Sequence, residues 1–168
     1  DVNILNNITI NDFAVHSDAA TYNYEVYYKT GTWVGYDANP SAWTLVGTAN
    51  NIVGNGSGVP TLLNLNLSLP LTAGQTYAFY ITNTAGTMYY TNGTAVGNVY
   101  TSNADMQILE GWGGGYPFTS PNTPRIWNGT IYYSGTAPCV SGRTPVTVTV
   151  NPLPSAVTVS GGGTFCGS

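Results

Sequence analysis

Residues 63–69 have the sequence LNLNLSL, in which four leucines alternate with two asparagines and one serine. Successive side chains of a β-strand point to opposite faces of its sheet, so this alternation predicts a strand with one buried face. We therefore expect Leu63, Leu65, Leu67 and Leu69 to point inward, with the asparagines and the serine facing solvent.

The same period of two continues on both sides of this stretch. In residues 22–28, Tyr22, Tyr24, Val26 and Tyr28 occupy alternate positions, which predicts a second strand with one apolar face. Residues 8–15 place their apolar side chains on one face only if the strand accommodates a bulge at Asn11-Asp12. Residues 71–77 (LTAGQTY) suit a tyrosine corner, in which the hydroxyl of a tyrosine at a strand start bonds to backbone a few residues upstream.

Further strands are expected around residues 88–91, 105–110 and 125–133, and no stretch has the helical period of 3.6. The glycine-rich segment 111–118 (GWGGGYPF) is expected to be a flexible loop with embedded aromatic residues. About eight short strands separated by Gly and Pro turns predict an all-β fold. We expect a two-sheet β-sandwich of jelly-roll or fibronectin/Ig-like type over residues 1–136.

Residues 137–168 have a different pattern. Residues 145–150 (PVTVTV) predict one strand, residues 151–154 (NPLP) a stiff break, and residues 156–159 the start of another strand. Two isolated strands do not fold alone, so this linker and its incomplete Ig-like strands should pair with the sandwich or with a neighbouring subunit. The candidate assembly strand is that of Val146, Val148 and Val150.

The two cysteines, Cys139 and Cys166, are 27 positions apart and both lie in this C-terminal extension. A disulfide between them would stabilise the chain by about 3.5 kcal/mol in the chain-entropy model and would join the two orphan strands. The alternative is that each cysteine pairs with a cysteine of a neighbouring repeat.

Charge is scarce in this chain. Only 6% of its residues are charged, against roughly 25% in an average soluble domain, and the formal net charge is -4. The three cations, Lys29, Arg125 and Arg143, form no basic patch, which argues against nucleic acid as a partner. No apolar run is long enough to insert into a membrane. A chain that begins at Asp1 rather than Met suggests a removed signal peptide or an excised fragment.

Residues that could support catalysis are few. Glu25 and Glu110 could form a glycosidase pair only if they faced each other across about 5 to 9.5 Å. The simpler expectation is that each lies on the solvated face of its own strand. His16 is the one histidine, and a weak metal site with Asp12 and Asp18 is less plausible than a turn histidine. We therefore expect no enzyme activity, no cofactor and no metal.

Aromatic residues gather in or beside the glycine-rich segments. Sugar rings present apolar C–H faces that stack on flat aromatic surfaces, so these residues are a candidate carbohydrate platform: Trp33, Tyr36, Trp112 and Tyr116. The alternative is that Trp43 and Trp127 fill the sandwich core while the loop aromatics cover its open ends.

Several stretches resemble modules of very large surface proteins exported by the type IX secretion system. Residues 139–154 resemble the last strand and linker of their Ig-like repeats, and residues 157–166 the first strand of the next repeat. The segment from residues 24–31 through residues 128–133 resembles a non-catalytic sandwich module of the same proteins. This resemblance implies an extracellular, cell-surface location and an adhesin-like parent protein.

Together these observations predict a non-enzymatic surface module with a structural or adhesive role. Strand addition between copies or neighbouring repeats would let it form filaments by self-association. The alternative prediction is a carbohydrate-binding module whose aromatic residues bind a polysaccharide.

Overall fold

The computed structural model describes residues 1–135 of the chain. The chain divides into two units, Asp1–Pro138 and Cys139–Ser168, and the account below concerns the first. The expected assembly strand and disulfide lie outside the described residues: Val146, Val148, Val150, Cys139 and Cys166.

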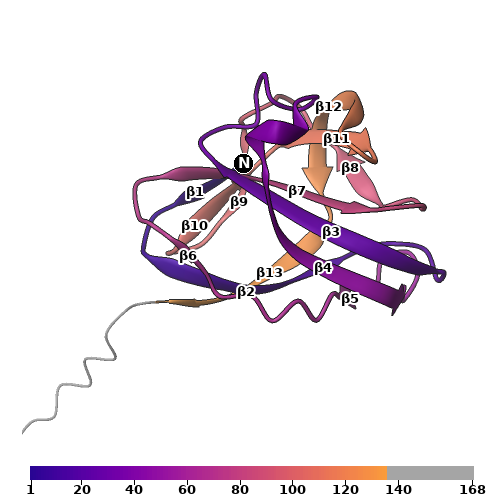
Figure 1. The fold of residues 1–168 in the computed structure, drawn as a ribbon. Helices are drawn as coiled ribbons and strands as arrows, with labels where there is room; N and C mark the ends of the chain where they lie inside the picture. The colour runs from indigo at the N-terminus through magenta and orange to yellow at the C-terminus, as the bar shows by residue number, and fades with distance from the viewer. Residues whose placement is uncertain (136–168) are drawn as a thin grey trace, which may run out of the picture. The chain divides into compact units, whose positions relative to one another are not determined.

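The described residues form strands joined by turns, with one short 3-10 turn at Pro40–Ala42 (Figure 1). No helix among them is long and apolar enough to cross a membrane. The strands are β1 (Val2–Ile4), β2 (Ile8–Val15), β3 (Thr21–Thr30), β4 (Thr44–Val53), β5 (Thr61–Leu62), β6 (Leu69–Leu71), β7 (Thr76–Asn83), β8 (Tyr90–Asn92), β9 (Val99–Ser102), β10 (Met106–Leu109), β11 (Gly111–Gly115), β12 (Thr119–Trp127) and β13 (Gly129–Gly135).

These strands build three antiparallel sheets. The largest has six strands in the order β4-β3-β7-β1-β10-β9. It packs on a four-stranded sheet in which β2 pairs with β13 on one side and with β5 and β6 on the other. A third sheet, β11-β12-β8, lies beside them. The fold is therefore the all-β, sandwich-like arrangement that the alternating pattern predicts.

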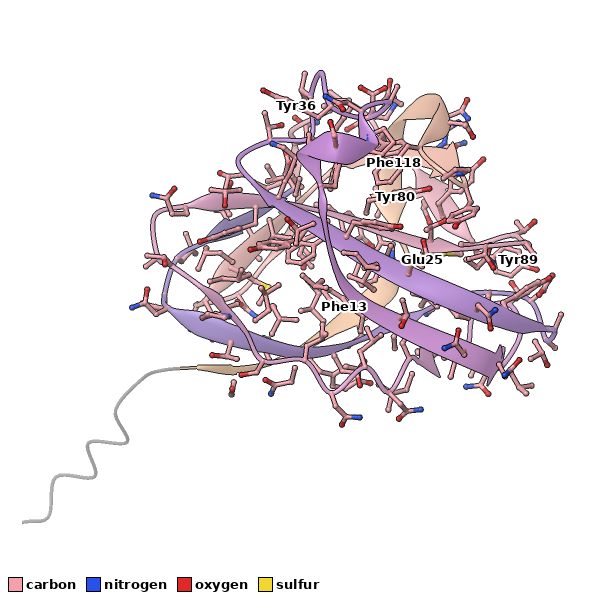
Figure 2. The ribbon with its side chains drawn as sticks, viewed as in Figure 1. Phe13, Glu25, Tyr36, Tyr80, Tyr89 and Phe118 are labelled. Carbon is pink, nitrogen blue, oxygen red and sulfur yellow. The ribbon has the colours of Figure 1, made fainter. Side chains whose placement is uncertain are left out.

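The main core lies between the six-stranded and four-stranded sheets, and the predicted inward residues fill it. Tyr24 and Val26 of β3 are fully buried, as is Phe13 of β2, which Figure 2 shows between the two sheets. The main core consists of Val2, Ile4, Ile8, Ile10, Phe13, Val15, Tyr24, Val26, Ala49, Leu63, Leu71, Tyr77 and Met106.

Two local predictions on the main core are confirmed. In the pairing of β2 with β13, Asp12 lies opposite Tyr132 and Ile10 opposite Tyr133, so Asn11 is the extra residue of a bulge. The tyrosine corner also forms, because the backbone N–H of Thr72 donates to the hydroxyl of Tyr77 at 3.2 Å.

The continuous strand predicted for residues 63–69 is wrong, although its side-chain alternation is correct. Leu63 is buried and the next three leucines pack against the main core. However, Asn64 and Asn66 have φ of 57° and 51°, in the left-handed region that asparagine tolerates better than most residues. The N–H of Leu65 then donates to the Asp12 carboxylate at 3.1 Å instead of to a neighbouring strand. The N–H groups of Leu63 and Leu67 still donate to carbonyl oxygens of β2, but regular strand pairing occurs only in β5, just before this stretch, and in β6 at its end.

The flexible loop predicted for residues 111–118 is also wrong, because its first part is strand β11. This strand pairs with β12 with register shifts between its glycines. Gly114 is required where it stands, since a Cβ there would lie 2.1 Å from the Trp112 ring and 2.8 Å from the Thr119 carbonyl oxygen. The glycines therefore let Trp112 fold over its own strand.

Candidate functional site

A second cluster of buried side chains lies apart from the main core and is built from aromatic rings. In β7, Tyr77 and Phe79 pack on the main core, whereas Ala78 and Tyr80 point to the opposite face of the sheet. Figure 2 shows Tyr80 beside Phe118, and their ring centroids are 4.3 Å apart. We call this group the aromatic cluster: Trp33, Trp43, Ala78, Tyr80 and Phe118, with Tyr27, Ala42 and Trp112 packed against them.

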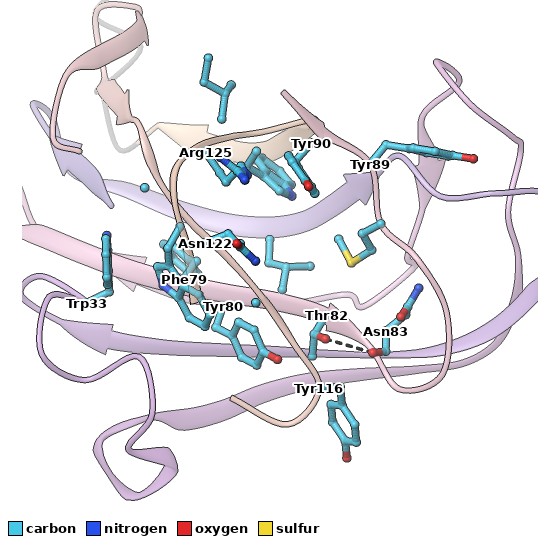
Figure 3. Close-up of a pocket in the computed structure, with 18 of the residues that line it drawn as sticks. Trp33, Phe79, Tyr80, Thr82, Asn83, Tyr89, Tyr90, Tyr116, Asn122 and Arg125 are labelled. Atoms are coloured by element: carbon cyan, nitrogen blue, oxygen red, sulfur yellow. Dashed lines mark hydrogen bonds between the residues drawn. The ribbon is translucent and has the colours of Figure 1, made fainter. Parts of the chain in front are cut away.

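A cavity of about 480 Å³ adjoins the aromatic cluster (Figure 3). Its lining comes from the end of β7, the segment 84–90, strand β11 and the end of β12. The cavity borders the part of β7 that β1 does not reach. Strand β1 pairs only with Thr76 and Tyr77 of β7, so residues 78–83 of β7 pair with β3 on one side and with no strand on the other. A volume of this size is typical of a small-ligand site.

Four buried nitrogens without a hydrogen-bond partner belong to residues that line this cavity. Among the described side chains, these are the only buried nitrogen or oxygen atoms that lack a partner. All four are N–H donors, and buried donors are nearly always paired in folded proteins. The residues around the cavity therefore carry four donors that no described residue satisfies. The four atoms are Trp33 Nε1, Asn83 Nδ2, Arg125 Nε and Trp127 Nε1.

Asn83 is held in one orientation at the end of β7. Its Oδ1 accepts a hydrogen bond from the N–H of Gly86 at 2.9 Å, which leaves the NH₂ group as the unpaired half of the amide. Its carbonyl oxygen accepts from the Thr82 hydroxyl at 3.0 Å (Figure 3). The residue is only 3% exposed, so its donor is rigid and shielded from bulk water.

Arg125 enters the cavity from β12, where it pairs with Asn92 of β8. Its Nη1 donates to the Pro124 carbonyl oxygen at 2.9 Å. Its guanidinium carbon lies 4.9 Å from the centroid of the Tyr90 ring, a cation–π arrangement that holds the plane of the group. Figure 3 shows Arg125 and Tyr90 side by side. These contacts fix the side chain and leave its Nε unpaired.

The four residues of the predicted carbohydrate platform do not form one exposed surface. Trp33 is 7% exposed and packs 5.9 Å from Trp112, which in turn stacks on Tyr80 at 5.3 Å and 9°. Tyr116 is exposed, and these three platform residues all line the cavity. Tyr36 is not part of the lining; its ring lies 4.3 Å from the Lys29 ammonium.

The other tryptophans pack as the alternative expectation proposes. Trp43 is buried in the aromatic cluster and donates its Nε1–H to the Tyr36 carbonyl oxygen at 2.9 Å. Trp127 packs against the main core, edge-on to Phe13 at 6.2 Å. Of these two tryptophans, only Trp127 also lines the cavity.

Glu110 is not solvated as expected but is buried, with 6% of its surface exposed. Its carboxylate accepts hydrogen bonds from the N–H and hydroxyl of Thr94 and from the N–H of Ala95. Burial raises the pKa of Glu110, but these three hydrogen bonds outweigh burial and hold the pKa below its ordinary value. Glu110 therefore anchors the segment between β8 and β9.

The Glu25 carboxylate contacts the hydroxyl groups of two tyrosines, Tyr27 on β3 and Tyr116 after β11. It accepts from the hydroxyl of Tyr27 at 2.7 Å and lies 3.5 Å from that of Tyr116. The negative charge of Glu25 is the largest cause that raises the pKa of Tyr116. Neither Glu25 nor Glu110 lines the cavity. Among residues 1–135, no group of three His, Cys, Asp or Glu side chains could hold a metal ion.

Asn83 and Arg125 are site residues that the sequence analysis did not identify. The sequence holds one feature that could have pointed to each of them. Asn83 continues the inward series Tyr77, Phe79 and Ile81, so it is a polar residue at an apolar position. Arg125 is one of only three cations in the chain.

Comparisons of the chain with protein-family models, with curated proteins and with solved structures found no match. The resemblance to modules of type IX-exported surface proteins therefore stays a prediction from the sequence.

Proposed function

We propose that this chain is a non-enzymatic, extracellular surface module whose adhesive role is to bind carbohydrate in the cavity. One observation carries the proposal: the four unpaired N–H donors all belong to residues of one aromatic-lined cavity. Sugar hydroxyls accept hydrogen bonds, and the apolar faces of sugar rings stack on aromatic side chains. A cavity with mostly apolar walls and a few fixed polar groups suits such a ligand.

Binding without catalysis fits the positions of the carboxylates. Glycoside hydrolysis needs two carboxyl groups on either side of the scissile bond. In the described residues, Glu110 is occupied by three hydrogen bonds and Glu25 by tyrosine hydroxyls, and neither lines the cavity. The extracellular location rests on the sequence resemblance and on the scarcity of charge.

Replacing Asn83 by Asp tests the site. Asn83→Asp keeps the Oδ1 acceptor for Gly86 but turns the free NH₂ donor into an acceptor. We expect saccharide affinity to fall by about tenfold or more, since a donor lost from a buried site costs about 1–3 kcal/mol. Isothermal titration calorimetry against neutral and acidic oligosaccharides, together with urea unfolding, measures affinity and stability separately.

Asn50→Asp is the matched control, because it adds the same charge at an exposed position of β4 outside the cavity. It should bind as the wild type does. Saccharide binding by Asn83→Asp at wild-type affinity, or no saccharide binding by the wild-type chain, would count against the proposal.

Self-association by strand addition is a second candidate, favoured by the outer strand β9. All four β9 residues are exposed, including Val99 (50%) and Tyr100 (53%), and β9 ends the six-stranded sheet. An edge of this kind offers unpaired backbone groups to another strand. Light scattering should show polymers that Ser102→Pro reduces, because the Ser102 N–H lies on the side of β9 away from β10. A monomer at every concentration would exclude this candidate.

A further inference from the structure

We infer that the saccharide bound in the cavity is acidic and that Arg125 binds its anionic group. This inference rests on the proposed carbohydrate function and adds the class of sugar. Only two residues of the cavity lining have charged side chains, Asp1 and Arg125. The Asp1 carboxylate is already used, since it accepts from the Thr32 hydroxyl at 2.7 Å and from the N–H of Trp33 at 3.2 Å.

The guanidinium of Arg125 has an unpaired donor, Nε, on one edge. Nη1 is bound to the Pro124 carbonyl, while Nε is buried and unpaired. In a planar guanidinium, the Nε–H and one Nη2–H point along the same edge, at the spacing of two carboxylate or sulfate oxygens. An anion that meets Nε therefore meets Nη2 as well and binds in a bidentate manner.

Energetics favour an anionic acceptor over a neutral one at this position. A charged group with a buried, unpaired donor is costly, and an opposite charge offsets that cost more than a hydroxyl does. Tyr90 fixes the guanidinium plane from one side, so little side-chain freedom is lost when the anion binds.

The remaining unpaired donors are uncharged and suit the rest of a sugar ring. Trp33 Nε1, Asn83 Nδ2 and Trp127 Nε1 each donate without carrying charge. One cationic fork with three neutral donors matches a sugar residue that carries one anionic group and several hydroxyls. Uronic acid and sulfated sugars share this chemistry.

The test compares three probes by isothermal titration calorimetry. They are oligogalacturonate, its methyl ester, which keeps the backbone but removes the charge, and a sulfated galactan oligosaccharide. We expect the wild-type chain to bind at least one anionic probe tenfold or more tightly than the methyl ester, with an affinity that falls as salt is added. Tighter binding of oligogalacturonate indicates a carboxylate ligand, and tighter binding of the galactan indicates a sulfate ligand.

Arg125→Gln should abolish this preference, so that the charged and methyl-ester probes bind with affinities within about twofold of each other, and Arg125→Lys should retain part of it. Lys29→Gln, which removes a cation that does not line the cavity, should bind as the wild type does. Circular dichroism checks that each variant is folded. Equal binding of charged and methyl-ester probes overturns the acidic class but leaves the carbohydrate function standing. If the wild-type chain binds none of the three probes and no neutral sugar of the panel, both the acidic class and the carbohydrate function are overturned.

Discussion

Polar groups in and beside the main core are hydrogen-bonded, whereas several buried donors around the cavity are not. In the main core, the Tyr24 hydroxyl donates to Ser17 Oγ at 2.9 Å, and the Asp12 carboxylate accepts from the N–H groups of Phe13 and Leu65. Around the cavity, four N–H donors have no partner within the described residues. Paired polar groups stabilise a fold, whereas unpaired buried donors are costly until a ligand or water accepts their hydrogen bonds. The two regions should therefore respond differently to substitution.

The largest loss of stability should come from the main core. Ile10→Ala removes a fully buried side chain that does not line the cavity. We expect the free energy of unfolding to fall by about 2–5 kcal/mol, since the lost methyl groups leave a void. Urea unfolding measures this loss. Leu5→Ala, at a position 46% exposed, should cost far less; similar losses at both sites would contradict the assignment of the core.

Gly114→Ala should affect stability and binding together. The new Cβ would meet the Trp112 ring and the Thr119 carbonyl, so Trp112 must leave its stack on Tyr80. We expect a loss of about 1–3 kcal/mol in the free energy of unfolding and weaker saccharide binding. Gly113→Ala is the control for stability alone, because it lies in the cavity wall and its Cβ would meet Arg125 Cγ at 3.5 Å, an ordinary separation. Equal losses of stability at the two glycines would remove the role given to Trp112.

A smaller effect is expected at the tyrosine corner. Tyr77→Phe removes the hydroxyl that accepts from the Thr72 N–H and keeps the buried ring. The free energy of unfolding should fall by about 1 kcal/mol, with saccharide affinity unchanged. Tyr28→Phe, whose ring stacks 6.5 Å from that of Tyr77, is the comparison variant and should lose less. A loss of binding in Tyr77→Phe would show that the two regions are coupled.

The smallest effect is a dependence on pH that comes from Glu110. Because its pKa is lowered in the folded state, its contribution is complete above the ordinary value of 4.5 and is lost as pH falls through the folded pKa. The protection of the Thr94 and Ala95 amides, taken as the observed exchange rate relative to the intrinsic rate at the same pH, should therefore fall in acid. Glu110→Gln should show low protection already near neutral pH. Protection of these amides that stays constant with pH in the wild type would rule out the anchoring role.

The side-chain directions were predictable from the sequence where burial alone decides them. The alternation in residues 22–28 and 63–69 gave the inward residues correctly, because a buried face requires it. The backbone pairing of residues 63–69 was not predictable, since the Asp12 carboxylate takes the N–H of Leu65 across a distance of 53 positions in sequence. Whether this N–H bonds to a neighbouring strand or to a distant carboxylate depends on the tertiary structure.

The site was predictable only in part. Trp33, Trp112 and Tyr116 were identified as ligand-binding candidates and do line one cavity, but Tyr36 does not. The cavity itself depends on where β1 ends opposite β7, which no local pattern encodes. Strand β11 was missed because glycine is rare in strands, and here the packing of Trp112 overrides that preference.

The contacts that the side-chain cations of residues 1–135 make are with uncharged partners. Lys29 donates to the carbonyl oxygens of Thr30 and Thr32 and lies over Tyr36, and Arg125 uses the Pro124 carbonyl and the Tyr90 ring. Glu110 likewise accepts from backbone and hydroxyl groups. Dissolved ions screen attraction between exposed opposite charges, and none of these contacts joins two opposite charges. Added salt should therefore weaken the attraction between Arg125 and an acidic sugar without weakening these contacts.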